Sequence, residues 1–129
     1  MNYKNLRFEI ENNIGRIILN RPEAANAITI PLVKELLDIA IKCESGAPVR
    51  VLVLQGEGSI FCAGGDLKYM TEQENLREAI SEMIGILHVA LSKIDHLDAP
   101  LIGAITGTAA GAGLSLVSAC DMAIAGKNV

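Results

Sequence analysis

Two segments rich in small residues could supply backbone hydrogen-bond donors to a negatively charged group. Residues 61–70 (FCAGGDLKYM) contain glycines that let the backbone approach a ligand closely, because no Cβ atom intervenes. Residues 100–115 (PLIGAITGTAAGAGLS) are typical of a strand that leads into a helix of small residues. The N–H groups in the first turn of such a helix are free, and with the helix dipole they favour an anion. The two segments therefore predict a site that stabilises negative charge.

Each segment also has an interpretation that involves no ligand. Residues 61–70 are equally typical of a strand-to-helix loop in which Asp66 caps the helix. The small residues of the segment 100–115 also permit tight helix packing. A third segment, residues 20–28 (NRPEAANAI), leaves a predicted strand and by itself is typical of a turn followed by a helix cap. Only the combination of the three segments is specific.

Other motifs that could do chemistry fail on their spacing. A dinucleotide-binding fingerprint would need a glycine where Leu116 stands. A nucleophile elbow around Ser115 would need a glycine at the position of Val117, and no Walker-type Gly-Lys-Ser/Thr sequence occurs. His88 and His96 lie near a predicted helix, and we interpret them as surface or packing residues.

The composition of the chain excludes several classes of protein. Of 129 residues, 50% are hydrophobic and 3% are aromatic, which allows a core built mainly from Leu, Ile, Val and Ala. The formal charge of −4, from 11 basic and 15 acidic residues, gives no electrostatic footprint for nucleic acid or an anionic membrane. Cys43, Cys62 and Cys120 are widely spaced and odd in number, so we expect neither a metal site nor a disulfide framework. No apolar signal-peptide region follows Met1, so a reduced cytoplasmic location is expected.

One uncharged stretch, residues 99–120, is long enough to span a bilayer. Gly103, Gly107 and Gly111 repeat there at the spacing of packed membrane helices. Pro100 and the content of Gly, Ser and Thr nevertheless make the stretch weakly apolar. We therefore expect a buried strand, a tight turn and a buried helix.

Strands that alternate with helices must position the three segments, which points to an α/β domain whose parallel strands are joined by crossovers. The expected elements, in chain order, are a hairpin of residues 6–11 and 14–19 turning at Asn12-Asn13, a helix from Thr29 to about Ser45, a strand at 51–54, a long helix through 76–94, a strand at 101–105, a helix after Gly107 and a strand at 122–125.

Three of these elements carry more specific expectations. Thr29 is expected to cap the first helix, with Pro31 in its first turn. Residues 51–54 form an uninterrupted apolar run, so this strand is expected to be buried on both faces. The long helix has apolar residues spaced to share one face, namely Leu76, Ile80, Met83, Ile84, Leu87, Leu91 and Ile94.

Taken together, the three segments resemble the crotonase (enoyl-CoA hydratase/isomerase) superfamily. The matching motifs are Asn-Arg-Pro…Asn-Ala, Phe-Cys-Ala-Gly-x-Asp-Leu-Lys and Pro-Leu-Ile-x-Ala…Gly-x-Gly…Ala-Cys-Asp-x-x-Ile-Ala, and they extend over nearly the whole chain. The resemblance implies a crotonase-like spiral of β-β-α units. Residues 1–129 would be the amino-terminal portion of that domain, with the carboxy-terminal remainder absent. Because family members usually assemble as trimers or pairs of trimers, a homo-oligomer is expected.

The resemblance also implies roles for particular residues. The backbone N–H groups of Gly65 and Ala112 would form an oxyanion hole that stabilises the enolate of an acyl-coenzyme A thioester. Lys68 would lie near the phosphates of coenzyme A, which enters as part of the substrate, so no permanently bound cofactor is expected. The residues that would line the coenzyme A path are Ala25, Ala27, Ala63, Gly64, Gly65, Asp66, Leu67 and Lys68.

The sequence departs from the pattern of true hydratases at Ser115, where their first catalytic Glu lies. A hydroxyl group cannot act as the carboxylate base that activates water near neutral pH. A second catalytic carboxylate usually lies beyond the position of Val129, so this chain alone is expected to be inactive. We therefore favour isomerisation somewhat over hydration. The alternatives are a non-catalytic acyl-CoA-binding or scaffold protein of the same fold, and a membrane-associated helical protein.

Overall fold

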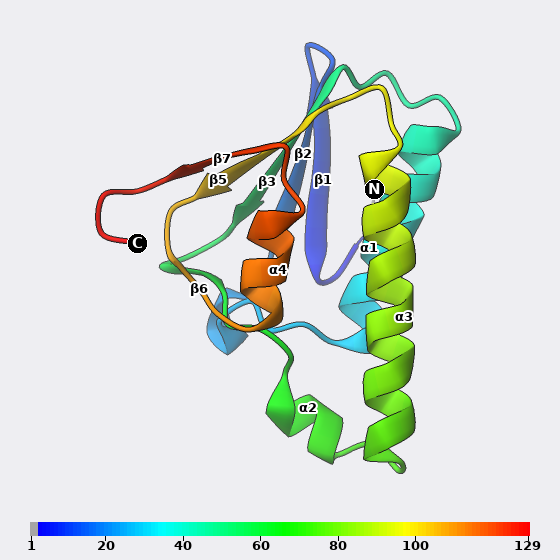
Figure 1. Cartoon of the computed structure of the whole chain (residues 1–129), viewed down its shortest axis with the longest axis vertical. Helices are drawn as coiled ribbons and strands as arrows, with labels where there is room; N and C mark the ends of the chain where they lie inside the picture. The colour runs from blue at the N-terminus through cyan, green and yellow to red at the C-terminus, as the bar shows by residue number, and fades with distance from the viewer. Residues whose placement is uncertain (1–2) are drawn as a thin grey trace.

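The computed structural model describes residues 3–129, and Figure 1 shows helices α1 and α3 lying side by side along one face of a sheet. The elements are β1 Leu6–Glu11, β2 Ile14–Leu19, η1 Pro22–Ala24, α1 Ile30–Glu44, β3 Val51–Gly56, β4 Ile60–Cys62, α2 Leu67–Thr71, α3 Leu76–Asp95, β5 Leu101–Ile105, β6 Thr108–Ala109, α4 Ala112–Ser118 and β7 Met122–Ala125.

The main sheet has the strand order β1-β2-β3-β5-β7. β1 and β2 form an antiparallel hairpin, whereas β2, β3, β5 and β7 run parallel to one another. α1 crosses over from β2 to β3, and α3 lies in the crossover from β3 to β5. The predicted α/β class and the predicted order of the long elements are therefore confirmed.

Local sequence explains where the hairpin turns and where α1 begins. Asn12 and Asn13 have φ angles of 53° and 64°, the left-handed conformation that a two-residue hairpin loop requires and that Asn tolerates. The Oγ1 atom of Thr29 accepts a hydrogen bond of 3.3 Å from the N–H of Leu32, and Pro31 stands in the first turn. Both the hairpin turn and the Thr29 cap were predicted correctly.

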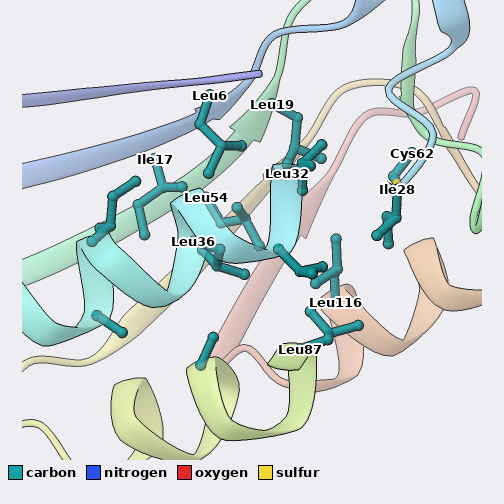
Figure 2. Packing of buried hydrophobic residues seen from close by; sticks show 14 of the residues in the cluster. Leu6, Ile17, Leu19, Ile28, Leu32, Leu36, Leu54, Cys62, Leu87 and Leu116 are labelled. Atoms are coloured by element: carbon teal, nitrogen blue, oxygen red, sulfur yellow. The ribbon is translucent and has the colours of Figure 1, made fainter. Parts of the chain in front are cut away.

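Aliphatic side chains fill the core between the sheet and the two long helices. Leu32 and Leu36 of α1 and Leu87 of α3 point toward Leu54 of β3, and Leu116 of α4 closes one end of the cluster (Figure 2). All five side chains are buried. The core is thus aliphatic, as the low aromatic content predicts.

The prediction that β3 is buried on both faces was wrong. Leu52 and Leu54 of β3 are buried, but Val51 and Val53 are only half-buried, because α1 and α3 cover a single face of the sheet.

The apolar residues that the sequence places on one face of α3 are buried only in part. Leu76, Ile80 and Ile84 are exposed by 44%, 37% and 42%, whereas Met83 and Leu87 are buried. An arc of about 100° around a helix is enough to face a core. Ile80 and Ile84 lie at the flank of that arc, whereas Leu76 is the first residue of α3.

The uncharged stretch 99–120 folds as β5, a tight turn, β6 and α4. Within residues 3–129, no helix is long and apolar enough to cross a membrane. The expectation that α4 is a buried helix was wrong, since only Gly113 and Leu116 of this helix are buried and Leu114 is 56% exposed.

Candidate functional site

A short second sheet brings the two segments of small residues together. β4 pairs in parallel with β6, with Cys62 opposite Ala109, and the N–H of Ala110 donates to the carbonyl of Cys62 at 3.0 Å. A Cβ atom on Gly64 would lie 3.0 Å from the carbonyl oxygen of Ala110 and 3.4 Å from the nitrogen of Ala112. The loop after β4 and the start of α4 are therefore in direct contact.

The start of α4 is pressed against β4 at a second position. A Cβ atom on Gly113 would lie 2.2 Å from the carbonyl oxygen of Cys62, a distance that no side chain could adopt without displacing the backbone. Close approach of α4 to β4 thus requires glycine at residue 113.

The third segment pairs with the loop after β4 on its other side. The N–H of Ala63 donates to the carbonyl of Ala25 at 3.0 Å, and the N–H of Ile28 donates to the carbonyl of Gly64 at 2.8 Å. The N–H of Asp66 then returns to the carbonyl of Ile28 at 2.9 Å. All three segments singled out in the sequence meet at one place in the fold.

This pairing determines where the N–H of Gly65 points. Ile28 lies opposite Gly65 in a parallel bridge and bonds to the residues before and after it. In a parallel ladder, the residue between two such bonds directs its own N–H to the other side of its strand. Among residues 3–129, neither the N–H of Gly65 nor that of Ala112 donates to an acceptor in the chain. Both donors are available to a ligand.

Asp66, for which the sequence indicates a place on the ligand path and also a helix cap, caps a helix in the structure. One carboxylate oxygen accepts from the N–H of Tyr69 at 3.0 Å and caps α2, and the other pairs with the guanidinium of Arg21 at 3.1 Å. The Tyr69 hydrogen bond and then the Arg21 charge hold the pKa of Asp66 below its usual value. Its carboxylate is thus ionised and engaged, which makes it unsuited to act as a general base.

The remaining predicted site residues border the same loop. Ala27 and Gly64 are buried, whereas Ala63, Leu67 and Lys68 are exposed, Leu67 by 78%. Ala25 is half-buried, and its carbonyl belongs to the pairing described above. Ser115 is exposed on α4, three residues after the Ala112 donor.

No nucleophilic thiol competes with the backbone donors for a role in chemistry. Cys62 is buried beside them, and burial raises the pKa of its thiol, which disfavours the reactive thiolate. Residues 3–129 also bring together no group of three His, Cys, Asp or Glu side chains that could hold a metal ion.

Two side chains that organise the site were missed in the sequence. Arg21 pairs with Asp66 and also donates to the carbonyl of Ala27. Asn26 is fully buried with its amide hydrogen-bonded. The Asn-Arg-Pro…Asn-Ala motif marked both positions, but a motif does not show which main-chain groups a side chain will reach.

Comparison with known proteins gives one consistent answer. Residues 9–129 match the family model described as Enoyl-CoA hydratase/isomerase. The chain is 38% identical over 125 residues to Enoyl-CoA isomerase/hydratase fer4 of Mycosarcoma maydis. The alignment covers 90% of this chain and 44% of that protein. It is 37% identical over 120 residues to human Enoyl-CoA hydratase domain-containing protein 2, mitochondrial, covering 92% of this chain and 40% of the relative.

A solved structure shows the same arrangement of elements. The crystal structure of an enoyl-CoA hydratase of Mycobacterium smegmatis superposes with a TM-score of 0.83 at 31% identity, over 95% of this chain and 48% of that one. The expected crotonase-like fold is thereby confirmed. The chain spans less than half the length of these relatives.

Proposed function

Because the chain belongs to the enoyl-CoA hydratase/isomerase family, we propose that it is the amino-terminal part of a longer enzyme that acts on acyl-CoA thioesters. The greater length of the relatives supports this proposal. The observation that carries it is the pair of N–H groups on Gly65 and Ala112. They lie on the loop after β4 and at the start of α4, which are in contact, and within residues 3–129 they have no acceptor.

The chemistry of a thioester gives these two donors a purpose. Removal of a proton from the α-carbon places negative charge on the thioester oxygen, and preorganised donors stabilise that charge as it develops. Each donor is typically worth about 3 to 4 kcal/mol of the barrier. The Gly65 donor is preorganised because its loop is held by hydrogen bonds to the segment around Ile28. α4 has only 7 residues, so we assign the effect of Ala112 mainly to its N–H rather than to a helix dipole.

Coenzyme A binding is proposed along the outer side of the same loop. The side chain of Lys68 is exposed three residues after the Gly65 donor, where its ammonium group can approach a phosphate. Exposed charge pairs are screened by salt, so this contribution to affinity should fall as ionic strength rises. The carbonyl groups of Ala25 and Ala27 are already engaged within the chain, which leaves the exposed edge of the loop for the ligand.

We propose isomerisation of a double bond in preference to hydration, because Ser115 provides no carboxylate to activate water. Isomerisation needs one base that moves a proton between two carbons, and the remainder of the longer protein would supply it. The alternative function is non-catalytic binding of acyl-CoA on the same scaffold. That alternative is favoured by Ser115 and by Asp66, whose carboxylate is engaged with Tyr69 and Arg21.

The test replaces Gly65 in the longer enzyme. Gly65→Pro removes the N–H, yet the neighbouring hydrogen bonds use the carbonyl of Gly64 and the N–H of Asp66, which remain. We expect turnover of a 3-enoyl-CoA to fall at least about a hundredfold. Gly65→Ala is the matched comparison, because it keeps the N–H and its methyl group would lie 3.5 Å from the Cε of Met83, an ordinary contact. Equal turnover in a folded Gly65→Pro variant and the wild type would remove Gly65 from the site.

A further inference from the structure

One buried polar side chain near the proposed donors organises the surrounding loops but has no part in the chemistry proposed above. Asn26 is 0% exposed. The other buried polar residue within 3–129 is Thr29, which caps α1. The Oδ1 of Asn26 accepts from the N–H of Arg21 at 2.8 Å. Its Nδ2 donates to the carbonyls of Glu57 and Ile60, each at 2.9 Å. The amide is therefore fixed from three sides.

The backbone at Asn26 is equally constrained. Ala25 and Asn26 have φ angles of 55° and 53°, two consecutive residues in the left-handed region, which costs energy for residues other than glycine. This bend presents the carbonyl of Ala25 to Ala63 and the N–H of Ile28 to Gly64. The pairing that directs the N–H of Gly65 therefore depends on the bend.

The side chain of Asn26 links this bend to the chain that precedes β4. Glu57 and Ile60 lie in and beside the connection from β3 to β4, and the donor loop follows directly after β4. The loop of residues 25–28 thus contacts the donor loop through its backbone and the start of β4 through one amide.

We propose that Asn26 is a positioning residue for the Gly65 donor: its amide holds the 25–28 loop in the one conformation that aims the Gly65 N–H at the thioester oxygen. The inference rests on the proposed function, since it concerns the geometry of the same oxyanion hole. Asn26 touches no substrate, and it acts through Ile28 and Gly64.

Such a role predicts an effect on the chemical step rather than on substrate binding. A misplacement of about 1 Å at a catalytic group can cost up to about a hundredfold in rate. The negative charge on the oxygen develops as the enolate forms and is small in the bound thioester, so a misaimed donor lowers kcat much more than it changes KM.

Asn26→Gly in the longer enzyme is the direct test, because glycine accepts the left-handed backbone and removes the amide. We expect kcat to fall between about tenfold and a hundredfold, with KM changed by less than about twofold. Asn5→Gly is the matched control, since it deletes an amide that donates to Glu35 at 2.6 Å beside β1, far from the donors in sequence. The control should lower the melting temperature but not kcat.

The infrared stretch of a bound thioester separates positioning from a general loss of stability. A butyryl-CoA labelled with ¹³C at the carbonyl should absorb at lower wavenumber when bound to the wild type than when free. In Asn26→Gly at saturating ligand, the band should move back toward the free value. If Asn26→Gly does not fold, the same band and kcat are measured in the isosteric Asn26→Asp. This variant keeps the acceptor and loses both donors.

The two readouts distinguish failure of the inference from failure of the function. An unshifted carbonyl band in the wild type would overturn the oxyanion hole itself. If Asn26→Gly shows the same band shift as the wild type and an unchanged kcat, the positioning role of Asn26 is overturned and the oxyanion hole stays in place. If kcat fell equally in Asn26→Gly and in the control Asn5→Gly, the role of Asn26 would be in stability alone.

Discussion

Both proposed donors are main-chain groups, so the identity of the side chain at residues 65 and 112 matters less than the path of the backbone. Ala112 carries a side chain and still presents an N–H that has no acceptor within residues 3–129. Gly113, one residue later, is constrained much more tightly, because it packs on the carbonyl of Cys62. At this scale the site tolerates variation where only an N–H is needed and not where two backbones touch.

Ser115 tests the kind of reaction at the level of one side chain. Positioned acid–base groups contribute about a hundredfold or more, so Ser115→Ala in the longer enzyme should change the isomerase rate by less than about tenfold. The measurement is turnover of a 3-enoyl-CoA, with addition of water to crotonyl-CoA followed in parallel. A hundredfold loss would show that the hydroxyl takes part in proton transfer. Strong hydration by the unmodified protein would contradict the preference for isomerisation.

Side-chain roles were predictable where the partner is close in sequence. Thr29 and Asp66 cap helices whose N–H groups lie three residues away, and both were recognised as caps. Asn26 bonds to carbonyls 31 and 34 residues away, so its role depends on how β3 and β4 pack. No local pattern could reveal it.

At the scale of elements, the short strands matter most to the site and were the least predictable. β4 and β6 have 3 and 2 residues, too few for an alternation of apolar and polar side chains to be detected. The long helices and the main strands show their periodicity clearly and were predicted. The missed pairing is nevertheless what joins the two donor loops.

The close contact of α4 with β4 leads to a prediction on stability. Gly113→Ala places a methyl group 2.2 Å from the carbonyl of Cys62, so α4 must move. Overpacking of this kind costs about 1–3 kcal/mol in the free energy of unfolding. Gly85→Ala on α3 is the control, because its methyl group meets nothing within 4 Å and should add up to about 1 kcal/mol of stability. Urea unfolding of the 129-residue chain measures both, and equal stability of the two variants would contradict the described contact.

At the scale of the whole molecule, the two edges of the main sheet differ in character. β1 carries the charged side chains Arg7, Glu9 and Glu11, which discourage further strand pairing. β7 lies at the opposite edge near the C-terminus (Figure 1), and all its residues are exposed and uncharged. Ile124 is 65% exposed, and its neighbours Ala123 and Ala125 line a hollow together with the exposed Leu114 of α4. This exposed apolar edge resembles a protein interface without its partner surface.

The exposed edge predicts the behaviour of the isolated chain. Residues 1–129 should self-associate through apolar surface and should show no turnover on crotonyl-CoA or a 3-enoyl-CoA. Ile124→Lys should reduce the association, because a charge on an edge strand opposes pairing. Ile41→Lys alters an isoleucine of α1 that is 42% exposed and should have less effect. Light scattering follows the association, and a monodisperse monomer of the wild-type chain would contradict this prediction.

The class of the fold was predictable because strands and helices alternate along the chain, and alternation of this kind leaves few topologies. Which faces remain uncovered was not, since the exposure of β7, α4 and the flank of α3 depends on what packs against them. The half-buried face of β3 is an example of the same limit.

The most direct test of the central claim is a crystal structure of the longer enzyme with a non-reactive acyl-CoA bound. Oxyanion donors lie about 2.7–3.1 Å from the oxygen they stabilise. We predict that the thioester oxygen lies within that range of both the Gly65 and the Ala112 nitrogen atoms. A thioester oxygen turned away from either nitrogen, or an acyl-CoA bound elsewhere on the protein, would contradict the account.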